Sequence, residues 1–179
     1  MTSKSKKINV HKVALLAILT SISIVIAIIE SFIPSIGIPG VKLGLTNIVI
    51  LIILYELGVL EAIIVDLLRV FLVSFIRGTF LSMGFVMSIT GAILSIAVMV
   101  LLHLVIKKFL IVGVSVIGAI AHVTGQIIVA VIYLGSGYVF YYLPIIALSA
   151  VITGIFVGIV AQLIINTKVI QKQKERYKF

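Results

Sequence analysis

Long runs of hydrophobic residues occupy most of the chain, and short groups of charged residues, Gly and Pro separate them. Several of these runs approach the 20 or so apolar residues that a membrane-spanning helix needs. The pattern predicts six helices, over roughly Val13–Ile29, Leu43–Tyr55, Val59–Phe75, Phe80–Ile106, Leu110–Leu134 and Phe140–Ile165. The third segment contains three charged residues, so a hydropathy window alone would score it poorly.

Composition identifies the solvent that surrounds these helices. Apolar residues make up 63% of the 179 residues and charged residues 11%, with neither Trp nor Cys. These values are typical of an integral membrane protein, so we expect an all-α fold with six transmembrane helices in a single domain over residues 1–179. The sequence contains no nucleotide-binding loop, aspartate-rich prenyltransferase motif, Ser/His/Asp set or metal-ligating cluster. We therefore expect no enzymatic activity and no cofactor.

Basic residues gather in three segments, the tails at about 1–12 and 168–179 and the pair Lys107–Lys108. Together they hold eleven of the fourteen Lys and Arg residues, and six membrane spans would place all three on one side. The positive-inside rule assigns that side to the cytoplasm of a multi-pass protein of the cell membrane, with both termini cytoplasmic. The net charge of +9 then reflects topology and attraction to membrane lipid, not nucleic-acid binding.

A candidate binding corner lies at the start of the second hydrophobic segment. Pro39 and Gly40 interrupt the chain, Lys42 is the lone charge beside them, and Asn47 follows within the apolar run. Free backbone N–H groups collect at the N-terminus of a helix, where they and the macrodipole favour anions. Lys42 and Asn47 are therefore candidate substrate-binding residues, on the side opposite the basic tails.

Charged residues within the third predicted helix are expensive in a membrane and require an explanation. Asp66 and Arg69 are three residues apart, so they can pair on one helix face. The sequence leaves two interpretations open: a buried ion pair that sets helix packing, or an Arg69 that meets an anionic ligand while Asp66 holds its guanidinium. Glu61 is interpreted as a residue of the cytoplasmic helix end and not as a ligand contact.

Polar and small residues form one stripe along the fifth predicted helix. They are Ser115, Gly118, His122, Gln126 and Tyr133. Such a stripe is expected to face protein or a cavity. A lone His is more often a packing residue than a ligand contact, but His122 and Gln126 are also candidates for lining the same pocket as Arg69 and Asn47.

Small residues recur four positions apart on three predicted helices, which lets helix backbones approach closely in lipid. The pairs or triplets are Ala17 and Ser21, Ser88 and Ala92, and Ala150, Gly154 and Gly158. Most are interpreted as internal packing. Ala17 and Ser21 are alternatively a docking surface for another membrane protein. Tyr138, Tyr141 and Tyr142 fit an aromatic belt or a loop over a ligand.

Several segments that combine Gly, Pro and intramembrane polar residues resemble one family in the same order. They are Pro39–Ile48, Leu67–Val70, Gly113–Ser115 continuing to Ala121–Gln126, and Tyr142–Pro144. The family is the Gx transporter family, also called heptaprenyl diphosphate synthase component I. The resemblance implies a six-helix bundle similar to the substrate-binding S-components of energy-coupling factor (ECF) transporters, which work with a transmembrane coupling protein and two ATPases. In those transporters a small-residue ridge on the first helix is the coupling surface, and Ala17 and Ser21 correspond to it.

The sequence and the resemblance together favour a membrane component of an importer that captures a small nutrient from outside. Lys42, Asn47, Arg69, His122 and Gln126 would hold an anionic or amphipathic molecule such as a vitamin, a quinone or an isoprenoid precursor. The family's other name implies the alternative, a non-catalytic membrane subunit of heptaprenyl diphosphate synthase in polyprenyl or menaquinone biosynthesis. A purely structural membrane protein is the third possibility.

Overall fold

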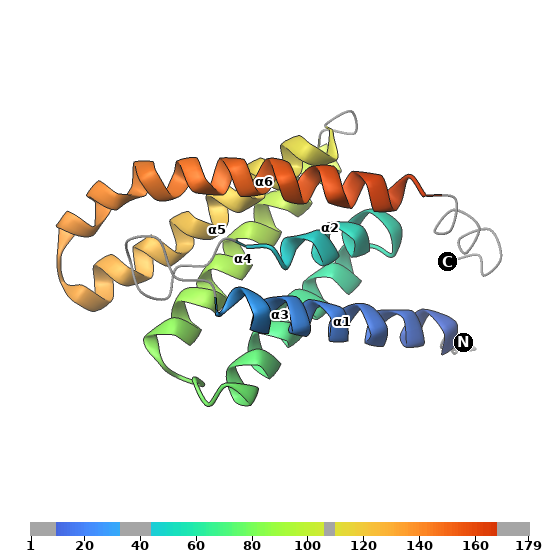
Figure 1. Ribbon diagram of the computed structural model, residues 1–179, viewed down its shortest axis with the longest axis horizontal. Helices are drawn as coiled ribbons and strands as arrows, with labels where there is room; N and C mark the ends of the chain where they lie inside the picture. Colours follow the sequence, from blue (N-terminus) through green and yellow to red (C-terminus); the bar gives the residue numbers. More distant parts are fainter. Residues whose placement is uncertain (1–9, 33–43, 106–109, 168–179) are drawn as a thin grey trace, which may run out of the picture.

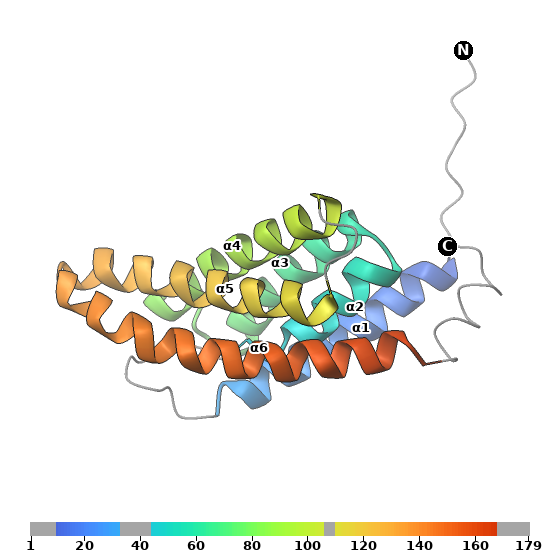
Figure 2. The ribbon, with the colours of Figure 1, turned by 90° about the horizontal axis from the view of Figure 1, so that it is seen from above.

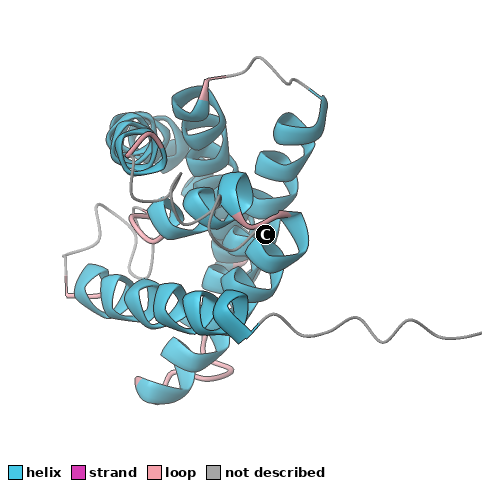
Figure 3. Cartoon of the chain, turned by 90° about the vertical axis from the view of Figure 1, so that its right-hand side faces the viewer, coloured by secondary structure: helices cyan, strands magenta, loops and turns pink. Residues whose placement is uncertain are grey.

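The computed structural model describes residues 10–32, 44–105 and 110–167. Within these ranges the chain forms six α-helices and one 3-10 helix, and no strand (Figures 1 and 3). The elements in order are α1 (Val10–Glu30), α2 (Asn47–Glu56), α3 (Val59–Ile76), α4 (Met83–Val105), α5 (Ile111–Leu134), η1 (Gly137–Tyr142) and α6 (Leu143–Ile165). The predicted all-α class and the order of six helices are confirmed.

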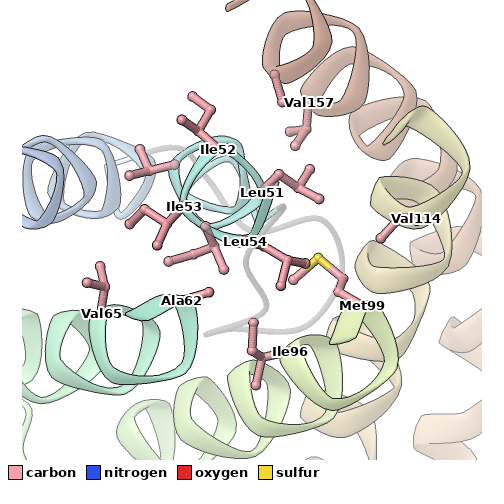
Figure 4. Close-up of a cluster of buried hydrophobic side chains, with 13 residues drawn as sticks. Leu51, Ile52, Ile53, Leu54, Ala62, Val65, Ile96, Met99, Val114 and Val157 are labelled. Carbon is pink, nitrogen blue, oxygen red and sulfur yellow. The ribbon is translucent and has the colours of Figure 1, made fainter. Parts of the chain in front are cut away.

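The shortest α-helix, α2, lies inside the bundle and is the centre of its main hydrophobic core. Side chains project from every side of α2, and residues of α3, α4, α5 and α6 meet them (Figure 4). All residues from Val49 to Leu54 are buried, and Ile50, Leu51 and Ile53 expose no surface. A helix that is apolar all round has no preferred outer face, so it is stable only when other helices enclose it.

Four of the helices are long and apolar enough to cross a membrane, namely α1, α4, α5 and the continuous η1–α6 segment. The ten residues of α2 span about 15 Å at 1.5 Å per residue, roughly half of a hydrocarbon core. Helix α3 has 18 residues but carries Glu61, Asp66 and Arg69 along its length. The four long apolar helices indicate a membrane protein. The expected number of six membrane spans stays a prediction.

Helices α4, α5 and α6 form the most closely packed part of the bundle, in which α5 lies between the other two (Figure 2). Glycines allow this approach. A Cβ atom on Gly154 would lie 2.8 Å from the Cα of Val116, and one on Gly158 would lie 2.6 Å from the Cα of Val112. The small residues of α6 thus act in internal packing, as predicted.

Turn residues separate several of the helices, and three helices begin later than predicted: α2 begins at Asn47 and not at Leu43, and α4 and α6 also begin late. Gly58 has a φ of 127°, a conformation that favours glycine, and it separates α2 from α3. Helix α4 begins at Met83 and not at Phe80, and α6 begins at Leu143 because η1 precedes it. In η1 the rings of Tyr138 and Tyr141 are stacked with centroids 6.2 Å apart. Both tyrosines, and Tyr142, are exposed.

The two ends of the bundle collect different helix termini. The start of α1 and the end of α6 lie toward one end, and the α5–η1–α6 turn lies at the other (Figures 1 and 2). Helix α5 runs antiparallel to α6, so its start lies on the side where α6 ends. Of the Lys and Arg residues in the three basic segments, only Lys12 at the start of α1 lies within the described residues, and the orientation of the bundle in a membrane stays a prediction.

Candidate functional site

A small polar cavity lies between the helices, beside α2. We call it the central cavity. Its lining comes from α1, the turn before α2, α3, α4 and α5, and consists of Ala27, Glu30, Gly44, Thr46, Arg69, Val70, Val73, Ser88 and His122. Its volume is about 10 Å³, which is room for about one water molecule. Two charged side chains from different helices, Glu30 and Arg69, face a space of this size.

Arg69 contributes the positive charge, and Asp66 on the same helix holds its guanidinium. Nε of Arg69 donates to Oδ1 of Asp66 at 2.8 Å, and Nη2 lies 2.6 Å from the same oxygen. Asp66 is fully buried and Arg69 is 6% exposed. The second oxygen of Asp66, Oδ2, is buried without a hydrogen-bond partner. The predicted Asp66–Arg69 pair is therefore present, and it positions the Arg69 side chain at the cavity wall.

Glu30 contributes a negative charge that the sequence analysis did not assign to the site. It is the last residue of α1, it is 4% exposed, and its Oε1 accepts a hydrogen bond from the backbone N–H of Gly44. Gly44 has a φ of 80°, and a Cβ there would lie 3.2 Å from the side-chain nitrogen of Asn47. A signal existed in the sequence: Glu30 is the single charge between Lys12 and Lys42, and a charge in such a segment usually has a function.

The predicted anion-binding corner differs from the one that the structure forms. Helix α2 begins at Asn47, and four residues of sequence separate it from Lys42, which itself lies outside the described residues. The N–H groups of Asn47, Ile48 and Val49 donate to the carbonyls of Gly44, Leu45 and Thr46 at 3.0, 3.2 and 3.1 Å. The N–H groups of this first turn are thus occupied by turn carbonyls, and the N–H of Gly44 binds the chain's own Glu30 carboxylate.

Asn47 is buried beside this corner. It is 2% exposed, and neither its side-chain oxygen nor its side-chain nitrogen has a hydrogen-bond partner. Asn47 does not line the central cavity itself, but its neighbours Gly44 and Thr46 do. Because a buried amide without partners is unfavourable, Asn47 has unused capacity to bind a polar group next to the cavity.

The stripe on α5 is buried at four of its five predicted positions. Ser115, Gly118, His122 and Gln126 are buried, and Nε2 of His122 lies 3.0 Å from the side-chain nitrogen of Gln126. Only His122 among them lines the cavity. Tyr133, 68% exposed, was wrongly included in the stripe. It lies seven residues beyond Gln126, in the last turn of α5, where its side chain is exposed.

Gln126 does not line the cavity, but its side chain contacts His122, which does. Replacing Gln126 with Met keeps the volume but removes the polar partner of a buried imidazole, so we expect a loss of about 1–3 kcal/mol in the free energy of unfolding. Thermal unfolding in detergent micelles measures this loss. The matched control is Thr124→Val, because the Thr124 hydroxyl bonds only the carbonyl of Ile120 one turn back. Equal effects of both substitutions would contradict the role of Gln126.

The remaining predicted residues lie away from the cavity. Glu61 pairs with Lys12 between α3 and α1, with both side chains about a quarter exposed, as expected for a residue near a helix end. Ala17 and Ser21 are exposed on α1, and the Ser21 hydroxyl donates to the carbonyl of Ala17 at 2.9 Å. An exposed small-residue pair leaves this part of α1 accessible to lipid or to a partner.

The groups around the cavity are able to bind polar molecules. A guanidinium, a carboxylate and an imidazole surround the cavity, and each recognises a polar group by hydrogen bonds. Within residues 10–32, 44–105 and 110–167, no three His, Cys, Asp or Glu side chains lie close enough to hold a metal ion. What the arrangement offers is a small polar pocket with apolar surroundings.

Fold and site together define a helical membrane protein with a buried, charged cavity among its helices. The family model for heptaprenyl diphosphate synthase component I matches residues 19–164, so the chain belongs to that family, as the sequence resemblance indicated. The match covers α2 to α5 completely and most of α1 and α6. Comparison with curated proteins and with solved structures gave no match.

Proposed function

We propose that this protein is the substrate-binding membrane component of an ECF-type importer and captures a small amphipathic nutrient from outside the cell. The observation that carries the proposal is Arg69, a buried guanidinium that lines the central cavity. A buried ion pair adds little to the stability of a fold, because the cost of desolvation offsets the attraction between the partners. A binding role explains why an arginine occupies this position in an apolar bundle.

The ligand contacts follow from the residues around the cavity. Arg69 and His122 contact the polar head of the ligand directly, and the Asn47 amide supplies additional hydrogen bonds. Lys42, which lies outside the described residues, is proposed as a further contact of an anionic group. The cavity volume of about 10 Å³ means that the lining residues must move apart to admit a group larger than water. The apolar part of the ligand lies among the helices.

The importer proposal includes a membrane topology and partners. Six helical segments cross or enter the bilayer, both termini face the cytoplasm, and the cavity opens to the exterior. Energy comes from a transmembrane coupling protein and ATPases, because the sequence contains no ATP-binding motif of its own. The coupling protein docks on Ala17 and Ser21, which are exposed on α1.

This docking surface gives a second prediction. Ala17→Leu and Ser21→Leu add bulk to an exposed helix face, so the fold should be unaffected while close helix–helix docking is lost. We expect at least a tenfold loss of co-elution with the coupling protein and ATPases. Ala97→Leu is the matched control, because Ala97 is an exposed small residue of α4. Unchanged co-elution in both α1 variants would contradict docking on this face.

The family name favours a second candidate function, a non-catalytic membrane subunit that binds a soluble prenyl diphosphate synthase. The same purification distinguishes the two functions. Co-elution with a coupling protein and ATPases supports the importer, and co-elution with a prenyl synthase alone supports the membrane subunit. A purely structural membrane protein predicts neither partner and no rise in melting temperature with any small molecule.

A further inference from the structure

We infer that the ligand of the central cavity carries both a positive and a negative group, with the positive group bound by Glu30 and the negative group by Arg69. This inference rests on the proposed binding function and narrows its substrate class. The sequence alone suggested an anionic or amphipathic ligand, with Lys42, Asn47, Arg69, His122 and Gln126 as its candidate contacts. Glu30 at the cavity wall changes that balance of charge.

Arg69 does not make the described cavity positive, because Asp66 already balances its charge. Lys12 pairs with Glu61 and Arg69 with Asp66, and no described residue forms an ion pair with Glu30. Glu30, Asp66 and Arg69 together therefore carry a net charge of about −1 when they are ionised. A ligand with only negative groups would approach the Glu30 carboxylate, for which the described residues supply no counter-ion, in a region of low dielectric, where repulsion is strong.

The position of Glu30 is unfavourable unless a positive group joins it. The residue is 4% exposed, and burial of a carboxylate without a counter-ion is costly. It also ends α1, where the negative end of the helix macrodipole disfavours a carboxylate. The N–H of Gly44 donates to Oε1, which fixes the carboxylate in place but supplies no full positive charge. A cationic ligand group would supply it.

The two charged groups come from different helices, and each would bind the opposite charge on the ligand. Glu30 lies on α1 and Arg69 on α3, and both line the same cavity without pairing with each other. An ammonium or other protonated nitrogen binds the carboxylate, and a carboxylate or similar acceptor binds the guanidinium. The head group of an amino acid has this combination of charges within a few ångströms.

Three compounds that share a phenyl group test the charge requirement. Phenylalanine carries both groups, 3-phenylpropanoate only the negative one, and 2-phenylethylamine only the positive one. Thermal unfolding of the wild-type protein in lipid nanodiscs gives the stabilisation by each compound. We expect phenylalanine to bind at least tenfold more tightly than either analogue. Equal or tighter binding of 3-phenylpropanoate, or no stabilisation by any of the three, would overturn the inference.

The substitution Glu30→Gln tests whether Glu30 binds the positive group of the ligand. It keeps an acceptor for the Gly44 N–H but removes the charge, so the preference for phenylalanine over 3-phenylpropanoate should disappear. Glu61→Gln is the matched control, since Glu61 pairs with Lys12 and neither residue lines the cavity, and it should keep the wild-type preference. A Glu30→Gln variant that still prefers phenylalanine would contradict the assignment.

These outcomes are separate from those that test the importer. If 3-phenylpropanoate binds best, or if a co-purified ligand is purely anionic, the binding function stands and only the charge inference fails. If no small molecule co-purifies and no partner co-elutes, the proposed function itself fails, whatever the ranking of the three compounds.

Discussion

Replacing Arg69 with Ala is expected to abolish ligand retention and to destabilise the protein by about 3–5 kcal/mol, without preventing membrane insertion. The loss of stability follows because the substitution leaves the fully buried Asp66 carboxylate without its partner. The loss of binding follows because Arg69 is the one cationic Lys or Arg side chain that lines the described cavity. Thermal unfolding and mass spectrometry of the retained ligand measure the two effects.

A double variant separates these two effects. Adding Asp66→Asn to Arg69→Ala removes the unpaired charge, so most of the lost stability should return while ligand retention stays abolished. Glu61→Gln serves as control, because it breaks the partly exposed pair with Lys12 and should cost about 0–1 kcal/mol without affecting the ligand. A double variant that is stable and retains the ligand would remove Arg69 from the site and leave the pair as a packing element.

Adding a methyl group at Gly154 or Gly158 is expected to force α5 and α6 apart. The new Cβ at Gly158 would lie 2.6 Å from the Cα of Val112, and the one at Gly154 would lie 2.8 Å from the Cα of Val116. Backbone atoms cannot move away as flexible side chains do, so Ala at either position should cost about 1–3 kcal/mol, and both together more. Unfolding in detergent micelles measures the change.

Gly137 is the control for this pair, because a Cβ there meets no atom within 4 Å. Gly137→Ala should leave the unfolding free energy almost unchanged, which would exclude a general effect of replacing glycine. If Gly158→Ala were as stable as Gly137→Ala, the close approach of α5 and α6 described above would be wrong.

Helix identity and order could be predicted because the apolar runs are long and their interruptions are sharp. The boundaries of α3 and α5 fall within one residue of those predicted. Asp66 and Arg69 were also correctly paired, since three residues on one helix place two side chains on the same face. Local spacing along a single helix was sufficient for each of these conclusions.

Features that depend on contacts between helices could not be predicted in this way. Glu30 and Gly44 are 14 residues apart, and their hydrogen bond forms only when the end of α1 meets the turn before α2. The late start of α2 depends on the turn at Gly44–Thr46. The positive φ of Gly44 in this turn accompanies the hydrogen bond from Gly44 to Glu30 of α1, which is a contact between distant parts of the chain. The stripe on α5 was extended to Tyr133 because spacing along a helix does not reveal which of its positions other elements cover.

The most direct test is to identify the small molecule that co-purifies with the wild-type protein in lipid nanodiscs. We expect a stoichiometric, amphipathic compound with a polar head that bears both charges, and we expect it to be absent from the Asp66→Asn/Arg69→Ala variant. A wild-type protein that carries no compound other than lipid, or a compound that the double variant retains equally well, would contradict this expectation.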